Sequence, residues 1–501
     1  MSNVKFGWYE AGLVPEGKTV NLAGQFYERI TSEVRDPLCV TALAIECGEE
    51  CAIFCACDLV STSSILLEKV RELLKDEKDI PGNRIILSAI HTHTAPSYSC
   101  RSDSLAMAGA GSSLQVLERY MPEDVQYEKL VEADKDENFF DGDEAFEYIA
   151  ARIAEAAKGA WNSRKEGKYA SAFGRAAVGM CRRVCYDDGS AKMWGDTNLA
   201  NFTELEGGND SGIEILFITD EKEKLTGVVA NVACPSQVLE HRSFMSADYW
   251  GDVKKLLRAK YGEDIFLLPL CSAAGDQCPR DMIRWVEPET PVDDPNIERN
   301  NPPERIADPS MFDVKGCEKA ARRIATEIFY AYEDVASYVE DSVLVHKTIK
   351  MDVPIRRVTI AEKDHALSEI NRFFKEHRGN INYRDNARMH IYAGTVNRYR
   401  IQQVKDVDEI EIHILRLGDI AFATNPYELF LNYGNQIRAR SLAKQTILIQ
   451  LCCGARGYLP TKKAEEGSHY SAYVSSGTTG HVGGEMLVRK TVSEINEMFR
   501  K

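Results

Sequence analysis

The sequence lacks a C-x-x-C pair, a long apolar run and an excess of basic residues. Without C-x-x-C spacing, the 14 cysteines give no sign of a structural zinc ribbon. No apolar run approaches the roughly 18 residues that span a bilayer, and the N-terminal MSNVKFGWYE has no apolar signal-peptide core. The 61 basic and 77 acidic side chains leave a net charge of −16, which disfavours nucleic acid and anionic membranes as partners. We therefore expect a cytoplasmic protein with reduced thiols, no membrane insertion and a small-molecule substrate.

The length and composition are those of a large globular protein. The chain has 501 residues, 44% hydrophobic and 28% charged, without an internal repeat or a low-complexity tract. We predict a single elaborated domain over 1–501, with a possible subdomain boundary in the Pro-rich segment near 287–312. The acidic segment 101–147 is interpreted as an insertion that is either a solvated surface loop or a lid over a cleft. A homo-oligomer is an open expectation.

Alternating apolar segments predict a mixed α/β fold. Apolar runs bounded by turn residues predict strands at 38–47, 51–60, 84–90, 172–180, 213–220, 225–233, 265–275, 342–355, 409–426 (a pair) and 446–453. Helical spacing predicts helices at 61–75, 143–161, 248–261, 313–335 and 361–378. Asn425-Pro426 predicts the start of a further helix, with Glu428 in its first turn. Residues 1–30 show no sustained period and are expected to be irregular.

The stretch RIILSAIHTHTAP at 84–96 is the strongest local signal. The predicted strand delivers His91 and His93, and side chains two residues apart on an extended chain share a face. Two imidazoles on one face suit a metal site, although hydrogen bonds or solvent satisfy such pairs equally often. Other motifs in the sequence are needed to choose between a metal site and a pair of structural histidines.

Several other chemically active side chains follow directly after apolar strands. In α/β proteins, functional side chains gather where strands end. We therefore predict one cleft built from strand-end loops, with these residues at its edge: Asp58, His91, Cys234, Asp276, Cys278, Glu428 and Tyr458.

The order of these motifs resembles the neutral/alkaline ceramidase family of zinc-dependent amidases. The resemblance covers nearly the whole chain, and SAIHTHTAP and AAGDQCP are its most specific parts. Supporting motifs, in the same order, are CRR at 181–183, VACPSQ around Cys234, SADYWGD at 246–252, NPYELF at 425–430 and RGYLPT around Tyr458. The resemblance implies a ceramidase-like catalytic domain of mixed sheets flanked by helices. The family's C-terminal immunoglobulin-like domain is expected to be missing, because the chain stops soon after the tyrosine motif.

The resemblance also implies roles for individual residues. His91, Glu428 and Tyr458 correspond to zinc ligands, and His93 to the histidine that polarises the substrate amide. Tyr470 corresponds to a tyrosine that faces the substrate, and Arg182 to the arginine of the substrate pocket. The implied cofactor is Zn²⁺.

Two positions depart from the family pattern. Cys234 stands where the family has a zinc-ligand histidine, and Cys278 stands where it has an active-site serine. A thiolate is a good zinc ligand, so Cys234 can complete the site; His241 can replace it, or the metal can be lost. Cys278 is either a nucleophile or an inert buried thiol.

Structural alternatives remain open for the other candidates. Asp58 can cap the helix that follows it, and Asp276 can hold its own loop through backbone N–H groups. Glu428 at a helix N-terminus is stabilised by the helix dipole without any metal. Tyr458, Tyr470 and Arg182 can serve in packing or ion pairs.

Three functions follow from these residues. The first is a metal-dependent hydrolase that cleaves an amide or related acyl bond of a small soluble substrate, with Asp276 and Cys278 as further catalytic candidates. The second is a metal-free hydrolase with Cys278 as nucleophile and His93 or His91 as base. The third is a ligand-binding pseudoenzyme. A glycosidase using Glu428 and Asp276 as paired carboxylates is a distant fourth.

Overall fold

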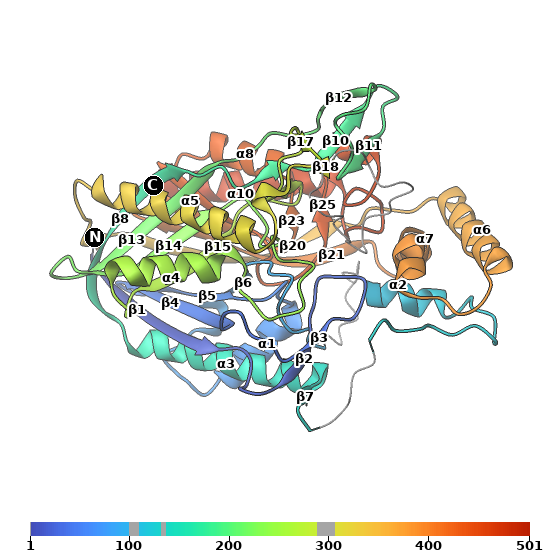
Figure 1. Ribbon diagram of the computed structural model, residues 1–501. Helices are drawn as coiled ribbons and strands as arrows, with labels where there is room; N and C mark the ends of the chain where they lie inside the picture. The colour runs from blue at the N-terminus through green and yellow to red at the C-terminus, as the bar shows by residue number, and fades with distance from the viewer. Residues whose placement is uncertain (1, 100–109, 132–136, 288–305, 501) are drawn as a thin grey trace.

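The computed structural model describes residues 2–99, 110–131, 137–287 and 306–500. Most of the predicted boundary at 287–312 and part of the acidic insertion at 101–147 lie outside these ranges. The described chain is a mixed α/β structure, as predicted, with two principal β-sheets packed face to face between helices (Figure 1).

The larger sheet has nine strands in the spatial order β15-β14-β13-β8-β1-β4-β5-β6, with β19 on β1. Its strands are β1 (Ser2–Gly12), β4 (Cys39–Cys47), β5 (Glu50–Cys57), β6 (Ile85–Ala89), β8 (Lys165–Arg175), β13 (Gly212–Asp220), β14 (Leu225–Val232), β15 (Phe266–Cys271) and β19 (Asp341–Ser342). The smaller sheet has the order β20-β21-β22-β24: Leu344–Pro354, Val407–Leu417, Ile420–Thr424 and Gln445–Ile449. Each strand predicted beyond residue 37 overlaps a strand of these sheets.

The expectation of an irregular N-terminus is wrong. Strand β1 lies inside the large sheet and pairs with β4 from Val4 to Gly12. Val4, Phe6 and Trp8 are buried at alternate positions. The alternation is that of a strand, but Gly7, Gly12 and the flanking polar residues obscure it. Pairing with β4, and at its first residues with β8 and β19, stabilises this segment as a strand.

Contacts across the sheets define the order of layers. Phe54 on β5 packs against Phe422 on β22, with ring centroids 5.2 Å apart. On β13, Glu214 accepts a hydrogen bond from Gln445 of β24, whereas Phe217, on the opposite face of the strand, packs against a helix. The small sheet therefore covers one face of the large sheet, and helices cover the other.

Helices complete the outer layers. Helices α1 (Ser64–Leu73), α3 (Gly142–Asn162), α4 (Tyr249–Tyr261) and α5 (Asp313–Glu333) lie on the side of the large sheet, and α8 (Leu431–Arg440) and α10 (His481–Arg500) on the small sheet. Ser63 caps α1 through its side chain. The predicted helices at 61–75, 143–161, 248–261 and 313–335 are confirmed.

A separate group of helices extends from one end of the molecule (Figure 1). It consists of α2 (Ala110–Leu117), α6 (Ile360–Glu376) and α7 (Tyr383–Ile401), which share a small core including Leu117, Ile370 and Met389. Capping boxes begin both α6, at Thr359, and α7, at Asn382. Part of the acidic insertion thus packs on α7, a helix that the sequence did not predict.

The expectation of a helix beginning at Asn425-Pro426 is also wrong. Glu428–Leu429 forms β23, which pairs in parallel with β25 (Tyr458–Leu459), and α8 begins only at Leu431. The backbone N–H of Glu428 donates to Gly457 O at 2.9 Å. In a helix starting at Pro426 this N–H would have no intrahelical partner, whereas here a tertiary hydrogen bond satisfies it.

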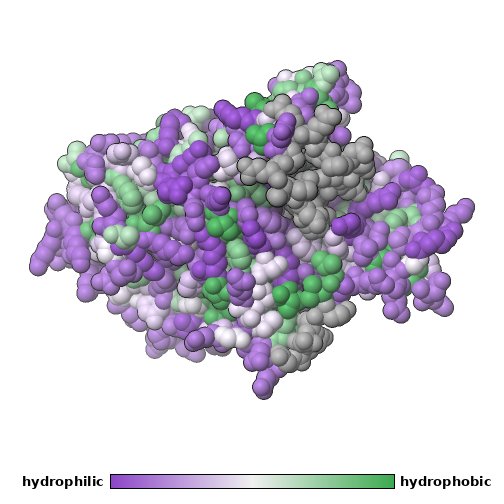
Figure 2. Space-filling view, in the orientation of Figure 1, coloured by the Kyte–Doolittle hydropathy of each residue, from purple (hydrophilic) through white to green (hydrophobic). Residues whose placement is uncertain are grey.

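The remaining elements are short. They are β2 (Thr19–Asn21), β3 (Ile30–Thr31), β7 (Phe139–Phe140), β9 (Met180–Cys181), β10 (Arg183–Tyr186), β11 (Ala191–Met193), β12 (Phe202–Leu205), β16 (Gln277–Cys278), β17 (Trp285–Val286), β18 (Ile306–Ala307) and α9 (Lys462–Gly467), with 3-10 turns at Gly82–Arg84 and Pro309–Met311. On the face shown in Figure 2, hydrophobic residues form small separate areas among polar ones. Among the described helices, none is long and apolar enough to cross a membrane.

Candidate active site

His91 lies just beyond the end of β6, and a hydrogen bond from its imidazole ring holds it in place. Its φ of 69° is left-handed, so the chain is not extended here. Nδ1 donates to Val60 O at 2.6 Å, which leaves the lone pair of Nε2 directed at Glu428, with Oε2 3.4 Å away. His91 and His93 therefore do not share a strand face, and that prediction is wrong. Nevertheless the two rings are neighbours, with centroids 4.9 Å apart at 88°.

Glu428 and Tyr458 are brought together by the pairing of β23 with β25. They are direct partners in the register of this short parallel ladder. Burial raises the pKa of Tyr458 well above its ordinary value, and the neighbouring Glu428 and Tyr470 raise it further. His91, Glu428 and Tyr458 thus approach one another from three separate segments of the chain.

Arg182 is a buried cation at the centre of the site. Nη1 donates to Gln237 Oε1 at 3.2 Å, and Nη2 donates to Gly275 O at 3.2 Å and to the Tyr458 hydroxyl at 3.4 Å. Its Nε is buried without a hydrogen-bond partner. Burial lowers the pKa of Arg182, but Tyr458, Cys278 and Glu428 outweigh it and keep the guanidinium charged. An unpaired buried donor is costly, so Nε is a ready donor to a bound oxygen.

His93 is buried, neutral and also without hydrogen bonds at either ring nitrogen. Burial lowers its pKa well below the ordinary value, and the charges of His91, Arg29 and Arg182 lower it further. Its Nδ1 lies 3.5 Å from Glu240 Oε2, beyond good hydrogen-bond geometry. Glu240 was missed by sequence reasoning. It belongs to the loop after VACPSQ, so it could have been predicted by treating each polar residue of this strand-end loop as a candidate.

Cys234 is fully buried and points at backbone oxygens. Its Sγ lies 3.6 Å from both Val178 O and Pro235 O, and burial raises its pKa well above the ordinary value, with Cys278 and Cys271 adding to the rise. Among the described residues, the ligand atoms of His91, Cys234 and Glu428 do not all lie within 4.8 Å of one another. The structure therefore brings together three of the four predicted ligands and leaves Cys234 apart.

Cys278 and Asp276 are engaged with the backbone. The Cys278 thiol donates to Arg280 O at 3.2 Å, and burial raises its pKa to about 11, so it stays protonated near neutral pH. Asp276 Oδ1 accepts from the Leu431 N–H at 2.8 Å, at the start of α8, and its carbonyl accepts from Arg182 N. The Asp276 carboxylate thus binds a backbone N–H, as the structural alternative expects, but that N–H belongs to α8 rather than to the loop of Asp276 itself.

A buried ion pair positions Tyr470. Arg183 binds both carboxylate oxygens of Glu206 at 2.9 Å and donates to Tyr470 O at 3.0 Å. The Tyr470 ring packs at right angles to Tyr458, with centroids 5.6 Å apart at 72°, and His390 of α7 contacts its other side. Tyr470 therefore connects the candidate site to the helical group.

Two other candidates lie elsewhere. His241 stacks on Phe312 and lies 3.6 Å from Asp313, so it does not replace Cys234 beside His91. Asp58 accepts from Cys39 N at 2.9 Å and neither caps α1 nor approaches the cleft. A cavity of about 500 Å³ is lined by Asp276, Phe430 and residues of α8 and α10, but by none of the predicted metal ligands.

Comparison with known proteins gives a structural match without a sequence match. No family model matches the chain, and no curated protein matches its sequence. The crystal structure of neutral ceramidase from Pseudomonas aeruginosa superposes with a TM-score of 0.65 at 14% identity, over 99% of this chain and 75% of the other. The chain has the neutral ceramidase fold. A structure described as ceramidase complexed with C2 matches with a TM-score of 0.66 at 13% identity, over 100% and 76%. The predicted resemblance is thereby confirmed for the fold.

The resemblance of the sequence motifs implies a zinc ion, and the geometry at His91 can be compared with that of one. Zinc bonds of about 2.0–2.1 Å at a tetrahedral angle place a nitrogen and an oxygen ligand about 3.3 Å apart, close to the 3.4 Å between His91 Nε2 and Glu428 Oε2. Two acceptors that face each other at this distance are stabilised either by a metal ion or by a second proton on His91. Val60 O fixes the His91 tautomer, as a backbone carbonyl commonly does for a metal-binding histidine. Tyr458 is the ladder partner of Glu428 and offers a third donor beside it, whereas Cys234 lies apart.

Proposed function

We propose that this protein is a metal-dependent hydrolase that cleaves an amide or related acyl bond of a small polar substrate. The observation that carries the proposal is the meeting of His91, Glu428 and Tyr458 beside two buried side chains with unused polar atoms, Arg182 and His93. The ceramidase fold supports the same reaction class, because neutral ceramidase is the matched structure.

His91, Glu428 and Tyr458 would hold Zn²⁺, which in such a site supplies a nucleophilic water at neutral pH and a Lewis acid for the substrate carbonyl. The protein's own groups bind and orient the substrate. Arg182 Nε donates to the carbonyl oxygen, where negative charge develops during attack. Neutral His93 can donate a hydrogen bond from one ring nitrogen and accept one at the other, and so can polarise the substrate amide.

A polar substrate is favoured by the carboxylate of Glu240. It lies 3.5 Å from His93 and only 14% of its side chain is exposed. A carboxylate here suits a hydroxyl or amino group on the substrate better than an acyl chain.

The test is metal content together with hydrolysis. The protein is purified without chelator or nickel, and zinc is measured in the native protein and in His91→Ala. We expect about one zinc equivalent to depend on His91, and hydrolysis of an amide and ester panel to disappear with it. Glu240→Gln serves as the matched control, because it removes a charge in the cleft but no metal donor. Zinc-independent hydrolysis, or no His91-dependent metal when zinc is supplied, would refute the proposal.

The alternatives predict other results. A catalytic Cys278 predicts inactivation by alkylation at that residue and indifference to chelators, but its burial and raised pKa disfavour it. A pseudoenzyme is favoured by Cys234, which lies apart from His91 and Glu428 although the resemblance implies a ligand at its position. It predicts ligand binding without turnover across the same panel.

A further inference from the structure

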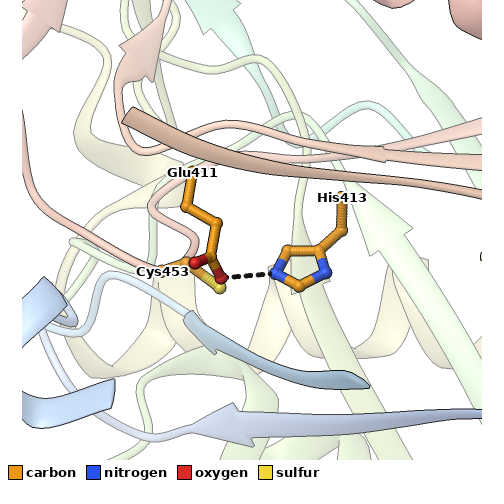
Figure 3. Close-up of side chains that lie close together, drawn as sticks. All are labelled: Glu411, His413 and Cys453. Atoms are coloured by element: carbon orange, nitrogen blue, oxygen red, sulfur yellow. Dashed lines mark hydrogen bonds and ion pairs between the residues drawn. The ribbon is translucent and has the colours of Figure 1, made fainter. Parts of the chain in front are cut away.

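Glu411, His413 and Cys453 form a cluster that shares no residue with the candidate active site (Figure 3). Each offers one ligand atom, and the three atoms lie within 4.8 Å of one another. Within the described residues, no other group of three or more His, Cys, Asp or Glu side chains has its ligand atoms this close together. His413 is fully buried, Cys453 is 3% exposed and the Glu411 side chain 11% exposed. A carboxylate, an imidazole and a thiol together are a donor set that zinc favours.

The hydrogen bonds around His413 fix which nitrogen faces the cluster. His346 Nδ1 must donate to Cys51 O, 3.0 Å away, because a carbonyl only accepts. His346 Nε2 is then the acceptor, and it takes the proton of His413 Nδ1 at 2.9 Å. This relay leaves His413 Nε2 as the nitrogen directed at Glu411 Oε1, 2.9 Å away, and at the Cys453 side.

An acceptor lone pair on Nε2 therefore faces a carboxylate oxygen and a sulfur. A cation makes this arrangement favourable, either a second proton on His413 or a metal ion between the three atoms, whereas the S–H of Cys453 is only a weak donor. Arg71 donates to both oxygens of Glu411 at 2.6 and 3.0 Å. These bonds position Glu411 equally for a proton on His413 or for a metal ion. Hydrogen-bonded carboxylates and relayed histidines are the outer partners typical of metal sites.

The backbone at Cys453 supports a specific function for its thiol. Leu451 and Cys453 both have left-handed φ values, 51° and 56°, which non-glycine residues adopt only with backbone strain. Cys453 N donates to Leu87 O of β6, and Cys452 N donates to Asn425 O. The strained segment thus lies between the strand that leads to His91 and the loop that leads to Glu428.

We propose that Glu411, His413 and Cys453 bind a second Zn²⁺ ion, with a structural role distinct from hydrolysis. The ion joins β21 of the small sheet to the segment after β24, which is hydrogen-bonded to β6 of the large sheet. Three protein donors leave a fourth position for water. Cys452 is a neighbouring buried thiol outside the cluster, with its Sγ 3.8 Å from that of Cys453.

The test replaces zinc by cobalt, because thiolate-bound Co²⁺ shows a charge-transfer band in the near ultraviolet. The full-length protein is expressed in cobalt-supplemented minimal medium, and Cys453→Ala is compared with the native protein. Cys452→Ala is the matched control, since it removes the neighbouring buried thiol. We expect Cys453→Ala to lose about one metal equivalent and the band, and Cys452→Ala to keep both the equivalent and most of the band.

A His91→Ala arm separates this site from the proposed catalytic one. It should lose one equivalent and keep the Cys453-dependent band; if it loses none, the catalytic metal fails while the second site stands. If a band remains in Cys453→Ala, the Cys234→Ala variant shows whether that band comes from cobalt bound to the Cys234 thiolate. His413→Gln covers the case in which Cys453→Ala does not fold. A native protein without a thiolate–cobalt band, or with a band that neither Cys453 nor His413 affects, would overturn the proposal in favour of a protonated His413.

Discussion

Glu206→Gln should destabilise the protein strongly, because it leaves a buried arginine without its counter-charge. Arg183 is fully buried and Glu206 is 5% exposed. The substitution is nearly isosteric, so it changes charge and hydrogen bonding but not packing volume.

The structure gives the magnitude. Glu206 accepts two charge-assisted hydrogen bonds from Arg183, both 2.9 Å long. Such bonds contribute about 1.5–3 kcal/mol each, and removing one partner of a buried ion pair costs about 3–5 kcal/mol. Glutamine retains one acceptor, so we expect the free energy of unfolding to fall by about 3 kcal/mol.

Guanidinium denaturation, followed by tryptophan fluorescence and by circular dichroism, measures this change. Glu409→Gln is the matched control, since Glu409 pairs with Lys350 at the surface, where the side chains are 59% and 65% exposed. The control should change the free energy by less than about 1 kcal/mol.

The result also bears on the candidate site. Arg183 donates to the carbonyl of Tyr470, so loss of its counter-charge should loosen Tyr470 and lower hydrolysis without removing the His91-dependent metal. A loss of stability below about 1 kcal/mol, or one equal to that of Glu409→Gln, would refute the reasoning that this pair is a buried support of the site.

Three further predictions concern single positions. Burial raises the pKa of Asp58 to about 6, so its contribution to stability is present below about pH 4 and is lost as the pH rises through 6. Between pH 4 and pH 7.5, the free energy of unfolding of Asp58→Asn should therefore rise by up to about 3 kcal/mol relative to that of the native protein, as measured by denaturation curves. Gly24→Ala places a Cβ 2.7 Å from the His93 ring at a φ of +96° and should abolish hydrolysis but keep the His91-dependent metal; full activity would contradict the role of His93. Iodoacetamide at pH 7.5 should label the partly exposed Cys185 before Cys278, as read by peptide mass spectrometry, and early labelling of Cys278 with loss of activity would favour the cysteine mechanism.

The sequence by itself determined the fold class, most core strands and helices, and the motifs of the candidate site. Apolar runs such as 213–220 and helical spacing such as 143–161 are local patterns, and each was confirmed because burial requires the same period in any tertiary context. Motif order was enough to predict the ceramidase fold, which the structural match confirmed.

Tertiary structure decided the features that depend on contacts between distant segments. Strand β1 exists because β4 pairs with it, and Glu428 lies on a strand because Gly457 and Tyr458 bind its backbone. His91 reaches Glu428 through a left-handed turn rather than along a strand face. The cluster of Glu411, His413 and Cys453 forms only when separate strands and loops pack together. Glu240 follows a predicted strand end, but its approach to His93 likewise depends on tertiary packing.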